Sequence, residues 1–209
     1  MLKALAERVM RTLFPRPEPI ADRAALGRFL DSRAAFLAQK GIVEFCRVRA
    51  GIHWQKLFAE EEFRHALSRS TWQAYGPALA LVCEMVEAAV RPHAGIDRQN
   101  AARAIVAIAR ERYLAYPIPA GFTAEQWAAG LDLVVRAIEE RQGEASRPVR
   151  DMPRQMARLV FAALPLHPSI VTNDADYIHN NLRMNLLRSH DDFLAVADLP
   201  ALARDLLRS

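Results

Sequence analysis

The sequence predicts an all-α protein, an irregular bundle of seven to nine helices. Ala, Leu, Arg and Glu, which are strong helix formers, dominate the composition. The alternation of β-branched or aromatic residues with polar ones that is typical of strands is absent over any run of five or more residues. Hydrophobic residues make up 52% of the 209-residue chain, which is enough for a core of this size.

The first predicted helix lies within residues 1–14 and is followed by a proline-rich tether. On a helical wheel its apolar side chains fall within a sector of roughly 100°, and its charged side chains lie on the other side. The apolar set is Leu2, Leu5, Ala6, Val9 and Leu13, and the charged set is Lys3, Glu7, Arg8 and Arg11. Pro15, Pro17 and Pro19 prevent the helix from continuing. We therefore expect a detachable amphipathic helix with its tether over residues 1–19, and a single helical domain over residues 20–209.

Capping patterns place the starts of several later helices. Asp22 and Asp198 are suitable N-caps, and Pro200 stands near the first turn of the last helix. Ser70 and Thr123 each stand three residues before a glutamine, which is the spacing of a capping box. With prolines and glycines as stop signals, the pattern predicts helices over 22–50, 54–67, 70–91, 97–115, 123–142, 153–164 and 172–189, and a short one from residue 198. The stretch 143–153 is the most plausible internal linker.

Composition excludes several classes of protein. A net charge of +4 is mildly basic and does not indicate a nucleic-acid-binding protein. Cys46 and Cys83 each stand alone in an apolar run, which is typical of buried thiols in a reducing compartment. No apolar run approaches the ~20 residues of a membrane span, and charges interrupt the N-terminus where a secretory signal would be apolar. The preference for Arg over Lys is typical of a GC-rich bacterial genome, so we expect a bacterial protein of the cytoplasm.

Two short acid-x-x-His steps are the sharpest chemical pattern. Glu62 precedes His65 by three residues, and Asp176 precedes His179 in the same way, so each pair shares a helix face. In ferritin-like bundles two such steps and two further carboxylates hold a pair of iron or manganese ions, and Glu44 and Glu84 could serve as the further carboxylates here. Two such steps arise by chance in roughly one sequence of this composition in seven, so we expect neither a metal nor another cofactor. Glycine-rich phosphate loops, GxSxG and HExxH are absent from the sequence.

The helix predicted over 172–189 carries an unusual polar face. Tyr177, Asn181, Asn185 and Arg188 share this face, although asparagine is a poor helix former. One interpretation is a surface that hydrogen-bonds a partner or ligand. The other is a helix whose amides satisfy the backbone groups of neighbouring loops.

Together these observations favour a non-enzymatic helical protein. We expect it to bind a protein partner or a second copy of itself, or to lie at the inner face of an anionic membrane through residues 1–14. Two alternatives stay open. One is a ferritin-like metal-carboxylate enzyme that uses the acid-x-x-His steps, and the other is a carrier whose helices enclose a lipid or quinone-type ligand.

Overall fold

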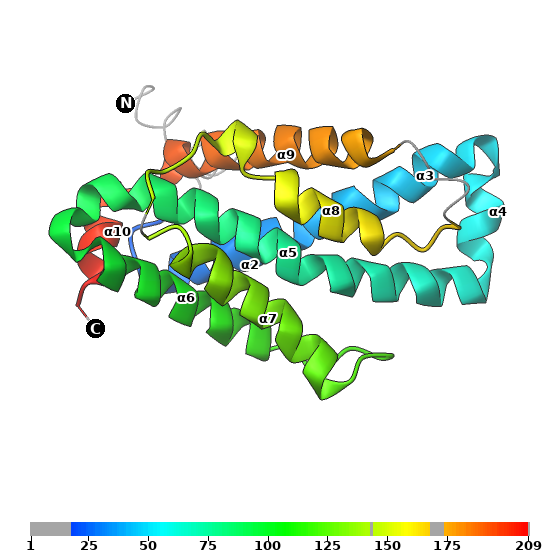
Figure 1. Cartoon of the computed structure of the whole chain (residues 1–209), viewed down its shortest axis with the longest axis horizontal. Helices are drawn as coiled ribbons and strands as arrows, with labels where there is room; N and C mark the ends of the chain where they lie inside the picture. The colour runs from blue at the N-terminus through cyan, green and yellow to red at the C-terminus, as the bar shows by residue number, and fades with distance from the viewer. Residues whose placement is uncertain (1–17, 143, 168–173, 209) are drawn as a thin grey trace, which may run out of the picture.

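The computed structural model describes residues 18–142, 144–167 and 174–208, which form a bundle of helices (Figure 1). This part of the chain contains no strand, and its one β-bridge joins Ile20 to Ala197. The predicted all-α class is therefore confirmed. In chain order the α-helices are α2 (Arg23–Gln39), α3 (Phe45–Ala50), α4 (Trp54–Ala59), α5 (Glu61–Ala94), α6 (Arg98–Leu114), α7 (Ala124–Glu139), α8 (Arg154–Ala162), α9 (Ala175–Val196) and α10 (Leu199–Leu206). Short 3-10 turns cover Gly51–His53, Gly95–Asp97 and Val149–Asp151.

Helix α5 runs the length of the molecule and forms its centre (Figure 1). Every residue from Ala74 to Glu87 is buried, because α2, α6, α7, α8 and α10 all pack around this part of the helix. Its sequence, AYGPALALVCEMVE, is apolar on all sides apart from two glutamates, which is typical of a fully buried helix.

Helices α2 and α3 form one rod that runs antiparallel to α5 (Figure 1). A π-helical turn, Lys40–Glu44, joins them without interrupting the helix. Gly41 in this turn allows a close approach, because a Cβ atom there would lie 3.0 Å from Cγ1 of Val160 on α8. The rod ends at Gly51, whose φ of 53° is a conformation that favours glycine.

Helix α7 crosses α5 at a contact between two glycines. A Cβ atom on Gly76 would lie 2.9 Å from both Cα and the carbonyl oxygen of Gly130. Beside this crossing, the Tyr113 hydroxyl of α6 donates a hydrogen bond to the Trp127 carbonyl oxygen at 2.9 Å. The absence of side chains at the two glycines lets the backbones of α5 and α7 meet directly.

Three of the predicted helix starts are confirmed by their caps. The Asp22 carboxylate accepts a hydrogen bond from the Ala25 N–H at 2.8 Å, and Asp198 accepts one from Ala201 at 3.0 Å. Thr123 forms the complete capping box with Gln126.

The predicted start at Ser70 is wrong, because Ser70 is buried inside α5, which begins at Glu61. The preceding helical turn already supplies carbonyl oxygens that accept the backbone N–H groups at this position. The Thr71 hydroxyl also donates to the Leu67 carbonyl oxygen at 2.9 Å. The predicted stop at Pro92 is also early, since α5 continues to Ala94. Six of the described α-helices have nine or more residues: α2, α5, α6, α7, α8 and α9. The predicted count of seven to nine helices is therefore not confirmed.

A short backbone pairing joins the start of the described chain to the segment between α9 and α10. The Ile20 N–H donates to the Val196 carbonyl oxygen at 3.0 Å, and the Asp198 N–H donates to the Ile20 carbonyl oxygen at 3.1 Å. The predicted amphipathic helix lies outside the described residues, so its detachment from the domain stays a prediction. Its expected contact residues, Leu2, Lys3, Leu5, Arg8, Val9, Arg11 and Leu13, lie there too.

Candidate functional site

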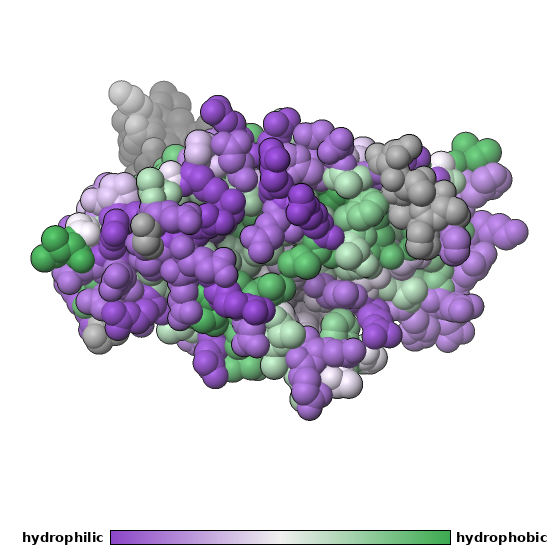
Figure 2. Space-filling model, in the orientation of Figure 1, coloured by the Kyte–Doolittle hydropathy of each residue, from purple (hydrophilic) through white to green (hydrophobic). Residues whose placement is uncertain are grey.

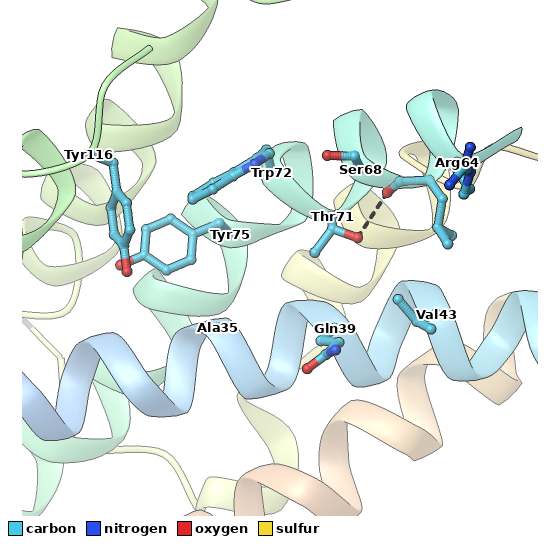
Figure 3. Close-up of a pocket in the computed structure, with 10 residues that line it drawn as sticks. Ala35, Gln39, Val43, Arg64, Ser68, Thr71, Trp72, Tyr75 and Tyr116 are labelled. Atoms are coloured by element: carbon cyan, nitrogen blue, oxygen red, sulfur yellow. Dashed lines mark hydrogen bonds between the residues drawn. The ribbon is translucent and has the colours of Figure 1, made fainter. Parts of the chain in front are cut away.

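An open groove runs between α2 and the first half of α5 (Figure 3). It has a volume of about 410 Å³ and is mainly apolar. One wall consists of Ala35, Gln39 and Val43. The other wall consists of Arg64, Leu67, Ser68, Thr71, Trp72 and Tyr75, and Tyr116 closes one end. We call this surface the α2–α5 groove.

Short side chains on both walls, such as Ala35 and Ser68, leave space between the two antiparallel helices. Ala35, Gln39 and Val43 repeat at four-residue spacing, which places them along one edge of the rod. Ser68 and Thr71 are the short residues of the opposite wall. Ala35, Gln39 and Ser68 are exposed, so the space between the walls is open to solvent.

One end of the groove is held by a shared carboxylate. The Tyr75 and Tyr116 hydroxyls both donate to Oδ1 of Asp31, at 2.7 and 2.8 Å. Burial and then the hydrogen bond to Asp31 raise the pKa of Tyr116 to about 12. The same causes raise the pKa of Tyr75 further. Both hydroxyls therefore keep their protons near neutral pH and act as fixed donors.

Aromatic rings extend the wall from Trp72 into the core. The Trp72 ring meets Tyr116 and Trp127 edge-on, at centroid distances of 5.1 and 5.8 Å, and Trp127 stacks on Tyr113 at 4.1 Å. Such pairs add about 0.5–1.5 kcal/mol each beyond their buried area. Trp72 is thus fixed in place, with one side toward the groove (Figure 3).

Both cysteines are buried free thiols. Burial raises the pKa of the Cys46 thiol to about 12 and that of the fully buried Cys83 thiol further, so neither supplies a thiolate nucleophile at neutral pH. Within residues 18–142, 144–167 and 174–208, no group of three or more His, Cys, Asp or Glu side chains is placed to hold a metal ion.

The four residues of the metal alternative are not brought together as one ligand group in the described structure. Glu62 and His65 lie exposed in the first turns of α5, and His65 is 3.7 Å from Glu61. Asp176 and His179 lie at the start of α9, where they line a cavity with residues of α8.

The carboxylates considered as further metal ligands have arginine partners. Glu44 accepts a hydrogen bond from Arg47 at 2.8 Å, which lowers the pKa of this glutamate. Glu84 is bound by Arg147 at 2.6 and 2.9 Å. Both carboxylates therefore serve ion pairs in this structure.

The polar face of α9 is less open than the sequence suggests. Tyr177 is exposed but its ring packs edge-on against Phe45 of α3 at 5.6 Å. Asn181 and Asn185 are half-buried, and the Asn185 amide donates to the Asn181 carbonyl and side-chain oxygens at 2.9 and 3.2 Å. Arg188 is exposed. The Asn185 amide thus bonds within its own helix, and recognition by this face stays a prediction.

Comparison with known protein families, with curated proteins and with solved structures returns no match. Among the described helices, none combines the length with the apolar character that a membrane span requires. A helical bundle alone does not define a function, so the chemistry of the sites must define it.

Proposed function

We propose that the protein is a non-enzymatic binding protein whose α2–α5 groove receives an amphipathic helix from a protein partner. The observation that carries this proposal is the open, apolar groove between two antiparallel helices, with a row of residues at four-residue spacing along one wall. Helices pack by inserting the side-chain ridges of one into the grooves of another. A third helix with an apolar face would complete the bundle at this position.

The openness of the groove favours a helix over a small molecule. Pockets for small ligands enclose about 70–90% of the ligand surface. Ala35, Gln39, Arg64 and Ser68 are exposed along both rims, so a small molecule would stay largely in contact with water. A helix would cover both rims at once.

The two ends of the groove differ in what they would recognise. Arg64 has no carboxylate within 4.0 Å among the described residues, so it can pair with an acidic residue of the partner. Trp72, Tyr75 and Tyr116 lie at the other end and provide an aromatic surface for an apolar anchor. Aromatic and arginine side chains are common anchors of protein interfaces. The contact of residues 1–14 with a partner or an anionic membrane stays a separate prediction, because these residues lie outside the described structure.

Photo-crosslinking from within the groove tests the proposal. A photoreactive amino acid at Ser68 is compared with one at Arg110, which is exposed on α6 away from the groove. We expect the Ser68 probe to crosslink, in cells of the source organism, to a protein segment with an apolar stripe at helical spacing. Adding Ala35→Arg, which fills the facing wall, should reduce this crosslink at least tenfold.

Two outcomes would contradict helix binding. Equal crosslinking from Ser68 and Arg110 would show that the groove has no specific occupant. Crosslinks from Ser68 to lipid or quinone, with no protein adduct, would favour the carrier alternative instead.

A further inference from the structure

A second concave site lies on the other side of α5, between α7 and α8. It has a volume of about 360 Å³, and buried Glu84 of α5 lies among its lining residues. Its charged lining residues are Glu84, Arg136, Glu140, Arg141, Arg147 and Arg158. We call it the α7–α8 cavity. Four arginines from three segments therefore meet two carboxylates.

Two of these arginines are held in place by the buried glutamate. Arg147 binds Glu84 through two hydrogen bonds, and its Nη2 also donates to the Met152 carbonyl oxygen at 3.3 Å. Arg141 lies 3.7 Å from Glu84 and pairs with Glu144 as well. These contacts neutralise Glu84 and fix the α7–α8 connection against α5.

The other two arginines form no ion pair among the described residues, although Glu140 lines the same cavity. Arg136 projects from α7 and Arg158 from α8, and both line the cavity. Neither has a carboxylate within 4.0 Å among residues 18–142, 144–167 and 174–208, whereas the neighbouring Arg141 and Arg147 do. A planar guanidinium binds phosphate or carboxylate oxygens through two parallel hydrogen bonds.

The cavity continues into an apolar hollow of about 290 Å³ that shares Leu133, Arg136 and Leu159 with it. Pro77, Phe122 and Trp127 line the far end of this hollow. Leu159 is 37% exposed, and hydrophobic residues gather around α8 in the middle of this face (Figure 2). One end of the combined space is therefore cationic and the other is apolar.

We propose that the α7–α8 cavity binds a small amphipathic organic oxyanion. Its phosphate or carboxylate group would lie between Arg136 and Arg158, and its apolar body would extend along Leu133 and Leu159 toward Trp127. The concave shape and the limited volume fit a small molecule better than an extended polymer. The cationic end of this site lies away from the α2–α5 groove, although Trp72 lines both the groove and the apolar hollow. The test of this proposal does not depend on a protein partner.

Calorimetric titration with matched probes tests the proposal. The probes are 1-naphthyl phosphate, 1-naphthoate, the neutral 1-naphthol and inorganic phosphate, each added to the full chain. At least one of the two naphthyl anions should bind at least tenfold more tightly than both 1-naphthol and inorganic phosphate. Arg136→Gln and Arg158→Gln should each weaken that binding at least tenfold, whereas Arg110→Gln on α6 should leave it within twofold.

A lipid headgroup and a free metabolite offer the same chemistry, so vesicles separate these two sources. Binding to phosphatidylglycerol vesicles that depends on Arg136 and Arg158, and that 1-naphthyl phosphate displaces, would identify a lipid as the source. Binding of the soluble probe without binding to vesicles would identify a soluble metabolite.

The proposal is overturned if neither naphthyl anion binds at millimolar concentration. It is also overturned if 1-naphthol binds as well as the anions, or if both arginine variants bind like the unaltered chain. Circular dichroism spectra of the variants establish that a loss of binding is not a loss of fold, and Arg158→Lys, which keeps the charge, should retain more affinity than Arg158→Gln.

Discussion

The two halves of α5 share one helix but have different surroundings. From Glu61 to Gln73, Phe63 and Ser70 are the buried residues, whereas every residue from Ala74 to Glu87 is buried. The first half packs against α4 and forms a wall of the α2–α5 groove. The second half is enclosed on all sides by other helices. A single element therefore presents a binding surface at one end and serves as the core at the other.

This difference shows how composition along one helix assigns its roles. The first half, EEFRHALSRSTWQ, alternates charged, small and aromatic residues, so its open side tolerates water. The second half keeps Glu84 and Glu87 buried because each has an arginine partner: Arg147 for Glu84, and Arg91 for Glu87 at 2.8 and 2.9 Å. A buried carboxylate without such a partner would be strongly destabilising.

The largest expected effect comes from removing a core side chain in the second half. Leu81 is fully buried, so Leu81→Ala should lower the free energy of unfolding by about 2–5 kcal/mol. Leu67 in the first half is half-buried beside the groove, so Leu67→Ala should cost less than about 1.5 kcal/mol. Denaturant melts of the two variants measure the contrast. Equal losses would show that both halves are packed alike in solution.

The glycine crossing of α5 and α7 gives the next largest effect. Alanine normally stabilises an open helix site by about 0.5–1 kcal/mol relative to glycine. At Gly76, however, the new Cβ would lie 2.9 Å from the backbone of Gly130, so Gly76→Ala should destabilise the fold by about 1–3 kcal/mol. Gly27→Ala is the comparison, because the nearest neighbour of its new Cβ would be the Arg112 side chain and not backbone, so it should cost less than Gly76→Ala. Thermal melts that rank the two variants in the opposite order would contradict this account of the crossing.

The fold was more predictable from the sequence than the site was. Caps such as Asp22 and Thr123 act within three residues, so a short sequence window contains the whole signal. The same local signal failed at Ser70, because a Ser-x-x-Gln pattern also fits inside a helix whose preceding turn is already formed. Local chemistry thus identified the helices but joined and divided some of them wrongly.

The candidate site depends on contacts that no short window contains. Ala35 and Ser68 form a groove only because α2 and α5 are neighbours, and neither residue has a distinctive motif. Glu84 was considered as a metal ligand, but its partner Arg147 lies 63 residues away in the chain. Trp72 has no motif either, because tryptophan is common both in cores and at interfaces.

Loss of one tyrosine hydroxyl at the end of the groove should have a moderate, pH-dependent effect. Tyr116→Phe removes a hydrogen bond to Asp31 and should cost about 1 kcal/mol at pH 8. Because folding raises the pKa of Tyr116 from its ordinary value to about 12, its contribution is complete below pH 10 and is lost as the pH rises from 10 toward 12. The stability gap between the unaltered chain and Tyr116→Phe should therefore shrink between pH 9 and pH 11.

The matched control for that titration is Tyr177→Phe, which removes an exposed tyrosine hydroxyl from α9. Comparing the two variants shows whether the effect belongs to the hydroxyl that binds Asp31. A gap for Tyr116→Phe that is constant from pH 9 to pH 11 would contradict the raised pKa and the fixed donor role of this hydroxyl.

The smallest expected effect on stability belongs to the walls of the groove. Ser68 and Ala35 are exposed, so Ser68→Arg and Ala35→Arg should each change the free energy of unfolding by less than about 0.5 kcal/mol. The same substitutions place a long charged side chain where a partner helix would lie. Ala35→Arg should therefore reduce the Ser68 crosslink at least tenfold, and Ser68→Arg should weaken binding of the same partner. A variant that keeps its stability but loses binding identifies a recognition surface. A variant of a packed wall would lose stability as well. If either variant lost more than about 1.5 kcal/mol in denaturant melts, the first half of α5 would belong to the core as fully as the second, and the groove would not be free to receive a partner.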